Sequence, residues 1–192
     1  MSKIEDYLKI TENSLPSLWL SEAIKILNRK GHALDLGCGA GRDTKYLLEQ
    51  GFIVTAVDKE LQAEEYIKKL PQENLTFILS KFEDFNFEKE KYDLINGQFS
   101  LPFIDLDEFN DVFNKIKYSL KLGGVFVGQL FGINDDWNKS KTTRTTFHTK
   151  EEAQKLFEDM KLIKFIEKDY DGTIADGTPK HWHSFHVLAR KN

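Results

Sequence analysis

Several features that mark other classes of protein are scarce or missing in this sequence. It contains one cysteine, Cys38, in 192 residues, which excludes an intramolecular disulfide and leaves no cysteine cluster for a structural zinc ion. Nowhere does it have the run of about 20 apolar residues that a membrane span needs. We therefore expect a soluble, cytoplasmic protein with no metal site and no membrane partner.

An excess of positive charge is missing too. The chain has 27 Lys and Arg against 31 Asp and Glu, a formal net charge of -4, so it has no broad attraction to a phosphate backbone. Nucleic acid is therefore not expected as a partner.

Internal repeats and linker-like segments are also absent. The sequence shows no low-complexity tract and has only four prolines. With 40% hydrophobic residues the chain can bury one core, and its length does not favour two. We expect a single domain over residues 1–192, with an N-terminal helical cap over 1–30 and a core over 31–192.

What the core does contain is a regular alternation of short apolar runs and helical patterns. Five strands are expected, at HALDL (32–36), FIVTAVD (52–58), LTFILS (75–80), YDLING (92–97) and VFVGQLFG (125–132). Strands linked through helices pair in parallel and carry helices on both faces of the sheet. The pattern predicts a doubly wound α/β fold, in which ligands bind at the carboxyl ends of the strands.

The last part of the core breaks this alternation. Two strand patterns, 161–170 and 182–191, are joined by DGTIADGTPK with no helix between them. Strands connected in this way pair antiparallel. The expected sheet is therefore mostly parallel, with one antiparallel strand near an edge.

Three glycines at alternate positions stand between the first strand and the next helix. Gly37, Gly39 and Gly41 allow the chain to turn sharply and let a ligand approach the backbone, because no Cβ stands in the way. Asp58 ends the second strand, where a carboxylate can accept hydrogen bonds from two neighbouring ribose hydroxyls. Together they indicate a cofactor that contains ribose.

The spacing of this loop favours one class of such cofactors over another. Dinucleotide-binding loops read G-x-G-x-x-G, whereas Arg42 takes the sixth place here and the run reads G-x-G-x-G. Asp35 at the end of the first strand suits a ligand with an ammonium group better than one with phosphates. A nicotinamide oxidoreductase is therefore disfavoured.

The segment LDLGCGAGRDTKYLLEQGFIVTAVD, residues 34–58, resembles the first motif and the acidic second-strand end of class I S-adenosylmethionine-dependent methyltransferases. The resemblance continues through FEDF, YDLING, LKLGGVFVGQLF and the closing strand pair. Small bacterial-type enzymes, including tellurite and thiol methyltransferases, are the most similar in length and motif. The resemblance implies a Rossmann-like, doubly wound seven-stranded sheet, mostly parallel with the last strand antiparallel, and S-adenosylmethionine as the cofactor.

The resemblance also implies roles for individual residues. Backbone at the glycine loop would hold the methionine part, Asp35 would face its ammonium group, and Asp58 would bind the ribose. The family's usual Asp-Ala pair reads Lys81-Phe82 here, so Glu83 and Asp84 both stay candidates for the adenine amino group. The complete expected cofactor site is Asp35, Gly37, Cys38, Gly39, Asp58, Lys59, Phe82, Glu83, Asp84 and Asn96.

The acceptor pocket is expected beyond the end of the fourth strand, where Gln98 and Phe99 follow Asn96. Trp137 lies in the polar segment 132–150, and it either closes over the substrate or anchors that segment to the surface.

Two histidines at the start of the last strand are the candidates for a catalytic proton acceptor. His181 and His183 share one face of that strand, and Trp182 and His186 share the other. The strand runs antiparallel to the others, so its beginning lies at the cofactor edge, and we assign His181 and His183 to the pocket. The alternative is that both rings are structural.

The sequence therefore predicts methyl transfer from S-adenosylmethionine to a small molecule by in-line displacement. Thiols, metalloids, hydroxyls and amines all stay open as acceptors, because positioning and exclusion of water can carry this reaction without a dedicated base. The alternative is a module that binds S-adenosylmethionine without turnover, as a sensor or an interaction partner. We expect a monomer or a homodimer.

Overall fold

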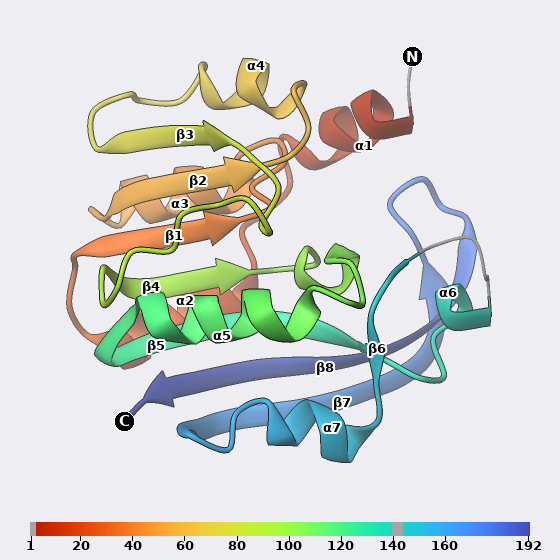
Figure 1. Cartoon of the computed structure of the whole chain (residues 1–192). Helices are drawn as coiled ribbons and strands as arrows, with labels where there is room; N and C mark the ends of the chain where they lie inside the picture. Colours follow the sequence, from red (N-terminus) through yellow and green to blue (C-terminus); the bar gives the residue numbers. More distant parts are fainter. Residues whose placement is uncertain (1–2, 140–143) are drawn as a thin grey trace.

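The computed structural model describes residues 3–139 and 144–192, which fold around one twisted sheet (Figure 1). Its main path has the strand order β3-β2-β1-β4-β5-β8-β7. The strands on this path are β1 (His32–Leu36), β2 (Ile53–Asp58), β3 (Leu75–Leu79), β4 (Tyr92–Gly97), β5 (Leu120–Gly132), β7 (Met160–Thr173) and β8 (Pro179–Lys191). Off the path, the two-residue strand β6 (Phe147–His148) pairs with β5.

The strand directions confirm the predicted doubly wound α/β architecture. From β3 to β5 the neighbours pair in parallel. The last strand, β8, pairs antiparallel with both β5 and β7. The order of the parallel strands reverses between β1 and β4, which opens a crevice at their carboxyl ends.

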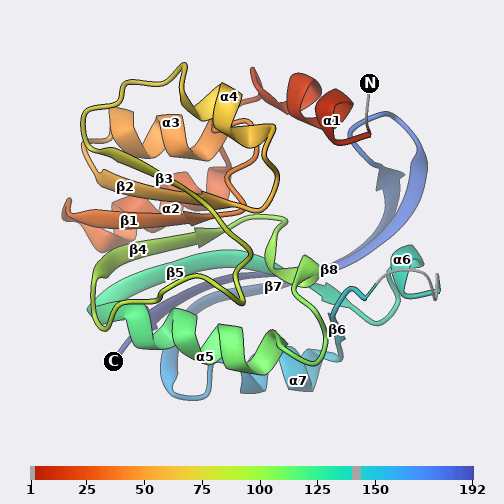
Figure 2. The same cartoon turned by 45° about the horizontal axis from the view of Figure 1, so that its top comes forward.

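Helices cover both faces of the sheet, as Figures 1 and 2 show. The helices of the described residues are α1 (Lys3–Thr11), α2 (Leu18–Leu27), α3 (Arg42–Glu49), α4 (Ala63–Ile67), α5 (Phe109–Ser119), α6 (Asp136–Lys139), α7 (Lys150–Lys155) and the 3-10 helix η1 (Leu101–Phe103). Helices α2 and α3 pack on one face, and α5 and α7 lie on the other. None of these helices is both long and apolar enough to cross a membrane.

The alternation of side chains along each strand builds a separate core on each face. Ala33 of β1 packs with Leu20 of α2 and Leu47 of α3, whereas the neighbouring Leu34 packs in the cluster that contains Phe113 of α5. All six residues of β4 are buried. A strand covered on both faces reads as a continuous apolar run rather than an alternation, which is how these strands were recognised in the sequence.

The two helices of the N-terminal region 1–30 occupy different places. Helix α2 belongs to the helical layer, and its Leu20 and Ala23 are fully buried. Helix α1 instead lies at the carboxyl ends of β1 and β2 (Figure 1). Helix α1 therefore lies over the crevice, and α2 reaches it through Leu18 and Trp19 in its first turn.

A buried ion pair ties the segment after β5 to β8. The carboxylate of Asp135 is fully buried and accepts hydrogen bonds from Nζ of Lys180 at 2.5 Å and from the backbone N–H groups of Trp137 and His183. The Lys180 ammonium also lies 3.7 Å from the centre of the Trp182 ring and 4.4 Å from that of Trp137. These contacts fix the start of the segment 132–150, of which residues 140–143 lie outside the described residues.

We predict that Asp135→Ala lowers the free energy of unfolding by about 3 to 5 kcal/mol, because it leaves the Lys180 ammonium buried without its counter-charge. Urea unfolding followed by circular dichroism measures the change. The double substitution Asp135→Leu with Lys180→Met should recover only the part due to the unpaired ammonium, because the backbone N–H groups of Trp137 and His183 still lose their acceptor. In a control, Lys68→Ala removes the exposed partner of Glu64 and should have little effect. Equal effects of the two single substitutions would contradict the stabilising role of the buried pair.

Candidate functional site

One large cleft lies at the carboxyl ends of the parallel strands. Its volume is about 1670 Å³, which is more than the 300–1,000 Å³ typical of a pocket for one small ligand. The ends of β1, β2 and β4 line one half of it, and residues of β5, β7 and β8 line the other. The size and the two-part lining indicate room for two ligands side by side.

The glycine loop forms a close-packed cradle at the wall of the cleft. Gly37, Gly39 and Gly41 all have positive φ angles, of 73°, 52° and 79°. A Cβ on Gly37 would lie 2.3 Å from the Cβ of Ser100. The loop can therefore turn against the chain after β4 only because this position lacks a side chain.

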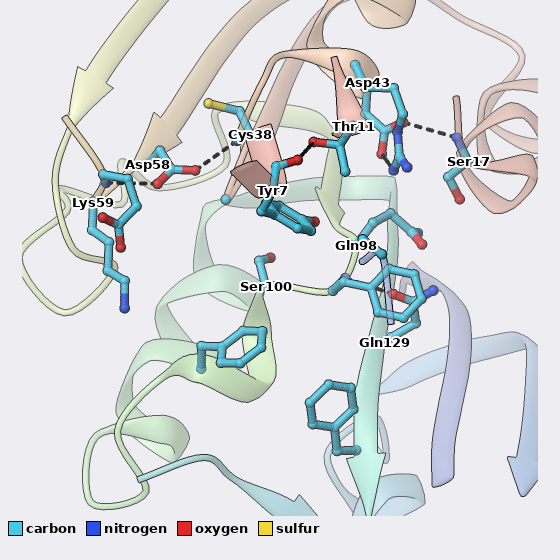
Figure 3. Close-up of a pocket in the computed structure, with 18 of the residues that line it drawn as sticks. Tyr7, Thr11, Ser17, Cys38, Asp43, Asp58, Lys59, Gln98, Ser100 and Gln129 are labelled. Atoms are coloured by element: carbon cyan, nitrogen blue, oxygen red, sulfur yellow. Dashed lines mark hydrogen bonds and ion pairs between the residues drawn. The ribbon is translucent and has the colours of Figure 1, made fainter. Parts of the chain in front are cut away.

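Asp58 joins this loop to the end of β2. Its carboxylate accepts hydrogen bonds from the backbone N–H of Gly39 at 2.8 Å and of Glu60 at 2.9 Å. Figure 3 shows Asp58 beside Cys38 and Lys59 on one side of the cleft. Two oxygens have about four lone-pair directions, so the carboxylate can still accept bonds from a ligand's hydroxyl groups.

A buried cluster rich in hydrogen-bond acceptors lies next to the loop. Asp35 accepts hydrogen bonds from Oγ1 of Thr44 at 2.6 Å and from Nδ2 of Asn96 at 2.8 Å. The other atom of the Asn96 amide, Oδ1, is buried and has no partner in the described residues. Burial first, and then the negative charge of Asp43, raise the pKa of Asp35 to about 7. An orphaned acceptor among carboxylates fits a cationic group such as an ammonium.

The chain after β3 forms the outer wall of the same half. Phe82, Glu83 and Asp84 all line the cleft. Glu83 is half-buried and accepts a long hydrogen bond, 3.4 Å, from the backbone N–H of Asp105. Asp84 is exposed. The choice between these two carboxylates for the adenine amino group stays open.

The structure brings the ten residues of the expected cofactor site together along this one cleft. It also brings Gln98, Phe99 and Trp137 of the expected acceptor pocket to the other half. Their binding roles stay predictions. Among residues 3–139 and 144–192, no group of three or more His, Cys, Asp or Glu side chains is arranged to hold a metal ion.

The placement of the two candidate histidines corrects the sequence interpretation. Neither His181 nor His183 lines the cleft. Nδ1 of His183 accepts a hydrogen bond from the backbone N–H of Asn134, and its Nε2 lies 3.1 Å from a carboxylate oxygen of Glu167. This ring packs so closely on Gly132 that a Cβ there would lie 2.2 Å from Nδ1.

His181 is held in a similar way on the same face of β8. Its two ring nitrogens contact Asp169 and Asp171 of β7, and these carboxylates raise the pKa of the ring. Since successive side chains of a strand point to opposite faces, it is Trp182, Ser184 and His186 that line the cleft. The sequence interpretation selected the wrong face of a strand that has histidines on both.

The second half of the cleft has aromatic walls. We call the cluster Phe99, Phe103, Phe131, Trp137 and Trp182 the aromatic pocket. Trp137 packs at 5.5 to 5.8 Å, between ring centres, against Phe103, Phe131 and Trp182. Phe99 completes the wall at 5.9 Å from Trp182. Such a surface suits contact with a planar apolar ligand.

Several cleft residues were not singled out in the sequence as parts of the site. Among them are Gln129, from the middle of a buried strand, and Ser184, from the last strand. A polar Gln129 within the apolar run VFVGQLFG was the available signal, because a polar group in a buried strand needs a specific partner.

Two features define a class I S-adenosylmethionine-dependent methyltransferase. One is the strand order, with its reversal between β1 and β4 and its antiparallel β8. The other is the G-x-G-x-G loop. Residues 3–176 match the family described as "Tellurite resistance protein TehB", and the chain belongs to that family.

Individual proteins of known sequence or structure resemble the chain more distantly. It is 29% identical over 145 residues to the mRNA cap guanine-N(7) methyltransferase of Caenorhabditis briggsae, covering 65% of this chain and 38% of that protein. It is 30% identical over 94 residues to the uncharacterized methyltransferase sll0829 of Synechocystis, covering 48% and 43%. The chain thus spans less than half the length of these two relatives.

Two solved structures show the same fold. TehB from Haemophilus influenzae has a TM-score of 0.80 at 21% identity and covers 99% of this chain and 68% of its own. The Burkholderia thailandensis 1,6-didemethyltoxoflavin-N1-methyltransferase, solved with bound 1,6-didemethyltoxoflavin and S-adenosylhomocysteine, has a TM-score of 0.66 at 19% identity, covering 100% of this chain and 92% of its own.

We predict that Asp58→Ala weakens S-adenosylmethionine binding by about 1.5 to 3 kcal/mol, or roughly 10- to 150-fold in Kd, the range for hydrogen bonds to a charged group. Isothermal titration measures the affinity. Asp58→Asn keeps the shape of the side chain and separates loss of charge from loss of packing, and Glu65→Ala on α4 serves as an exposed control. An unchanged Kd in a folded Asp58→Ala protein would remove Asp58 from the cofactor site.

We also predict that S-adenosylmethionine affinity falls as the pH drops below about 7. In the free protein, Asp35 takes up a proton through a pKa of about 7, and a bound ammonium favours the ionised carboxylate. Above pH 7 the carboxyl group of Asp35 is already ionised, so S-adenosylmethionine binds without proton release. Below pH 7 the carboxyl group must first lose its proton, so each pH unit lowers the affinity for S-adenosylmethionine by up to about tenfold. Titrations at pH 6, 7 and 8 test this, and Asp35→Asn should flatten the profile. A flat profile in the unmodified protein would show that Asp35 is not the linked group.

Proposed function

We propose that this protein transfers a methyl group from S-adenosylmethionine to a small molecule bound in the aromatic pocket. The observation that carries the proposal is the continuity of the cleft, in which a glycine cradle with buried carboxylates opens directly into aromatic walls. Its volume exceeds that of one ligand. Donor and acceptor would meet at the end of β4, between Asn96 and Gln98, which follows the strand.

The residues of the first half fit this cofactor. The orphaned Oδ1 of Asn96 and the carboxylate of Asp35 suit the ammonium group, and the open lone pairs of Asp58 suit the ribose. When bound, S-adenosylmethionine would supply a methyl carbon whose bond to sulfur breaks as the acceptor's lone pair bonds to it. Both electrons of the broken bond would go to the sulfur, and a proton on the attacking nitrogen, oxygen or sulfur would leave to solvent. The task of the protein is to align the two ligands and exclude water.

The charges around the cleft favour an acceptor without negative charge. In its described lining, ten Asp and Glu stand against five Lys and Arg. The guanidinium of Arg144, at the rim, is engaged by Asp105 and Asp107. An oxyanion of a metalloid would need several basic groups, so a thiol, a hydroxyl or a nitrogen on a neutral molecule fits this cleft better.

Two of the similar proteins support a planar acceptor. Their names specify methylation of a ring nitrogen, at guanine N7 and at N1 of 1,6-didemethyltoxoflavin. The rings of the aromatic pocket meet one another edge-to-face or tilted, and they offer aromatic contacts to a planar ligand. We therefore place neutral, planar molecules with a nucleophilic nitrogen, oxygen or sulfur first among the acceptors.

The first experiment is titration of the purified protein with S-adenosylmethionine, S-adenosylhomocysteine and NAD, followed by radiolabelled methyl transfer to a panel of acceptors. The panel contains N-heterocycles, phenols, thiols, amines and tellurite. We expect micromolar binding of the first two ligands, no binding of NAD, and transfer to a neutral planar acceptor.

Variants of the aromatic pocket separate an enzyme from a module that only binds the cofactor. Trp137→Ala should lower kcat/KM at least about tenfold, because it removes a wall of the acceptor half, and should change the Kd for S-adenosylmethionine less than about threefold. Cofactor binding without transfer to any member of the panel would favour the binding module, and NAD binding alone would contradict the assignment of the loop.

A further inference from the structure

A chain of hydrogen bonds crosses the floor of the acceptor half, from the end of β4 to β8. The backbone N–H of Phe99 donates to Oε1 of Gln129 at 2.7 Å. Nε2 of the same amide lies 3.1 Å from Nδ1 of His186. Figure 3 shows Gln98 and Gln129 together on this side of the cleft. Gln129 is 2% exposed, so water does not compete for its amide.

This chain fixes the tautomer of His186. A backbone N–H can only donate, so the oxygen of Gln129 faces Phe99 and its NH₂ group faces the ring. Nδ1 must then accept a hydrogen bond, and in the neutral ring the proton lies on Nε2. This nitrogen lies 3.3 Å from Oγ of Ser184. Nε2–H therefore donates to this oxygen, and the pair presents the Ser184 hydroxyl as a donor at the wall of the cleft, which both residues line.

The surroundings hold the ring neutral and in one orientation. His186 stacks on Trp19 with 5.2 Å between ring centres and meets the edge of Phe99 at 6.4 Å. Burial lowers its pKa to about 4, and the positive charge of Lys168 acts in the same direction. At neutral pH neither nitrogen is a free base, since Nδ1 is already occupied and Nε2 is already protonated.

Gln98 supplies a second, independent sign of a ligand at this place. Its side chain is only 8% exposed and lines the cleft, yet neither Oε1 nor Nε2 has a partner in the described residues. Leaving a buried amide without hydrogen bonds costs free energy. A ligand that offers both a donor and an acceptor would satisfy it.

We infer that the acceptor is a neutral molecule whose polar edge pairs with the Gln98 amide and accepts a hydrogen bond from the His186–Ser184 pair, and that His186 acts as a donor and not as a general base. The inference rests on the proposed methyl transfer and specifies the substrate class of that site. Lactams and related heterocycles, which carry a C=O next to an N–H, have such an edge. Gln129 is the positioning residue that sets the tautomer.

The first test reads the tautomer directly and needs no acceptor. Long-range proton–nitrogen NMR spectra of protein labelled with ¹⁵N-histidine, with His186→Ala for assignment, should show the Nε2–H form and a pKa below 5. Gln129→Glu should reverse the tautomer and raise the pKa of His186 by at least one unit, since a carboxylate accepts from Nδ1–H. The Nδ1–H form, or a pKa above 6, in the unmodified protein would overturn the donor role.

The second test uses two probes of similar shape, 2-quinolone with a lactam edge and naphthalene without one, titrated into protein saturated with S-adenosylhomocysteine. We expect 2-quinolone to bind at least tenfold more tightly. Gln98→Leu and His186→Ala should each reduce that preference at least fivefold. His181→Ala, on the other face of β8, is the matched control and should keep it. Equal binding of the two probes, or a preference that survives both pocket substitutions, would overturn the inference.

The two tests also separate this inference from the proposed function. Failure of S-adenosylhomocysteine to bind would contradict the methyltransferase assignment, whereas the NMR result on His186 stands without any ligand. Tight cofactor binding with no lactam preference would leave the methyltransferase assignment in place and refute the acceptor class.

Discussion

The site depends on the position of β1 between two parallel neighbours. Its register with β4 sets Asp35 directly opposite Asn96, and its register with β2 sets the glycine loop beside the end of that strand. The first pairing produces the buried carboxylate and amide, and the second lets Asp58 reach the backbone of Gly39. A shift of one residue in either register would turn these side chains to the wrong face of the sheet.

The same arrangement places groups in the cofactor half that lower the stability of the free protein. A carboxyl group with a pKa of about 7, an amide oxygen without a partner in the described residues and three glycines with positive φ angles lie side by side at the ends of β1 and β4. Each costs free energy in the free protein and is relieved by a ligand of the right charge and shape. The two extensive apolar clusters on the faces of the sheet stabilise the fold and offset the free-energy cost of this preorganised site.

The sequence was sufficient to predict what depends on local pattern. The alternation of apolar runs with helices predicted the parallel sheet, the connection DGTIADGTPK over residues 171–180 predicted the antiparallel pair, and the G-x-G-x-G run with Asp58 indicated one edge of the cleft. It was not sufficient where the outcome depends on which face of β8 turns inward. That strand has His183 and Phe185 on one face and Trp182 and His186 on the other, and both faces are largely buried, so hydrophobicity could not choose between them.

The two halves of the cleft are built from different parts of the chain. The cofactor half comes mainly from the chain up to Asn96, whereas the aromatic pocket and its polar floor come from Phe99 onward, supported behind by the ion pair between Asp135 and Lys180. Substitutions of the aromatic pocket therefore leave the hydrogen bonds of Asp35 and Asp58 intact. Because the two halves are separate, related chains can change the residues of the acceptor half and so diverge in what they methylate. They can do so while they keep the residues that bind the same methyl donor.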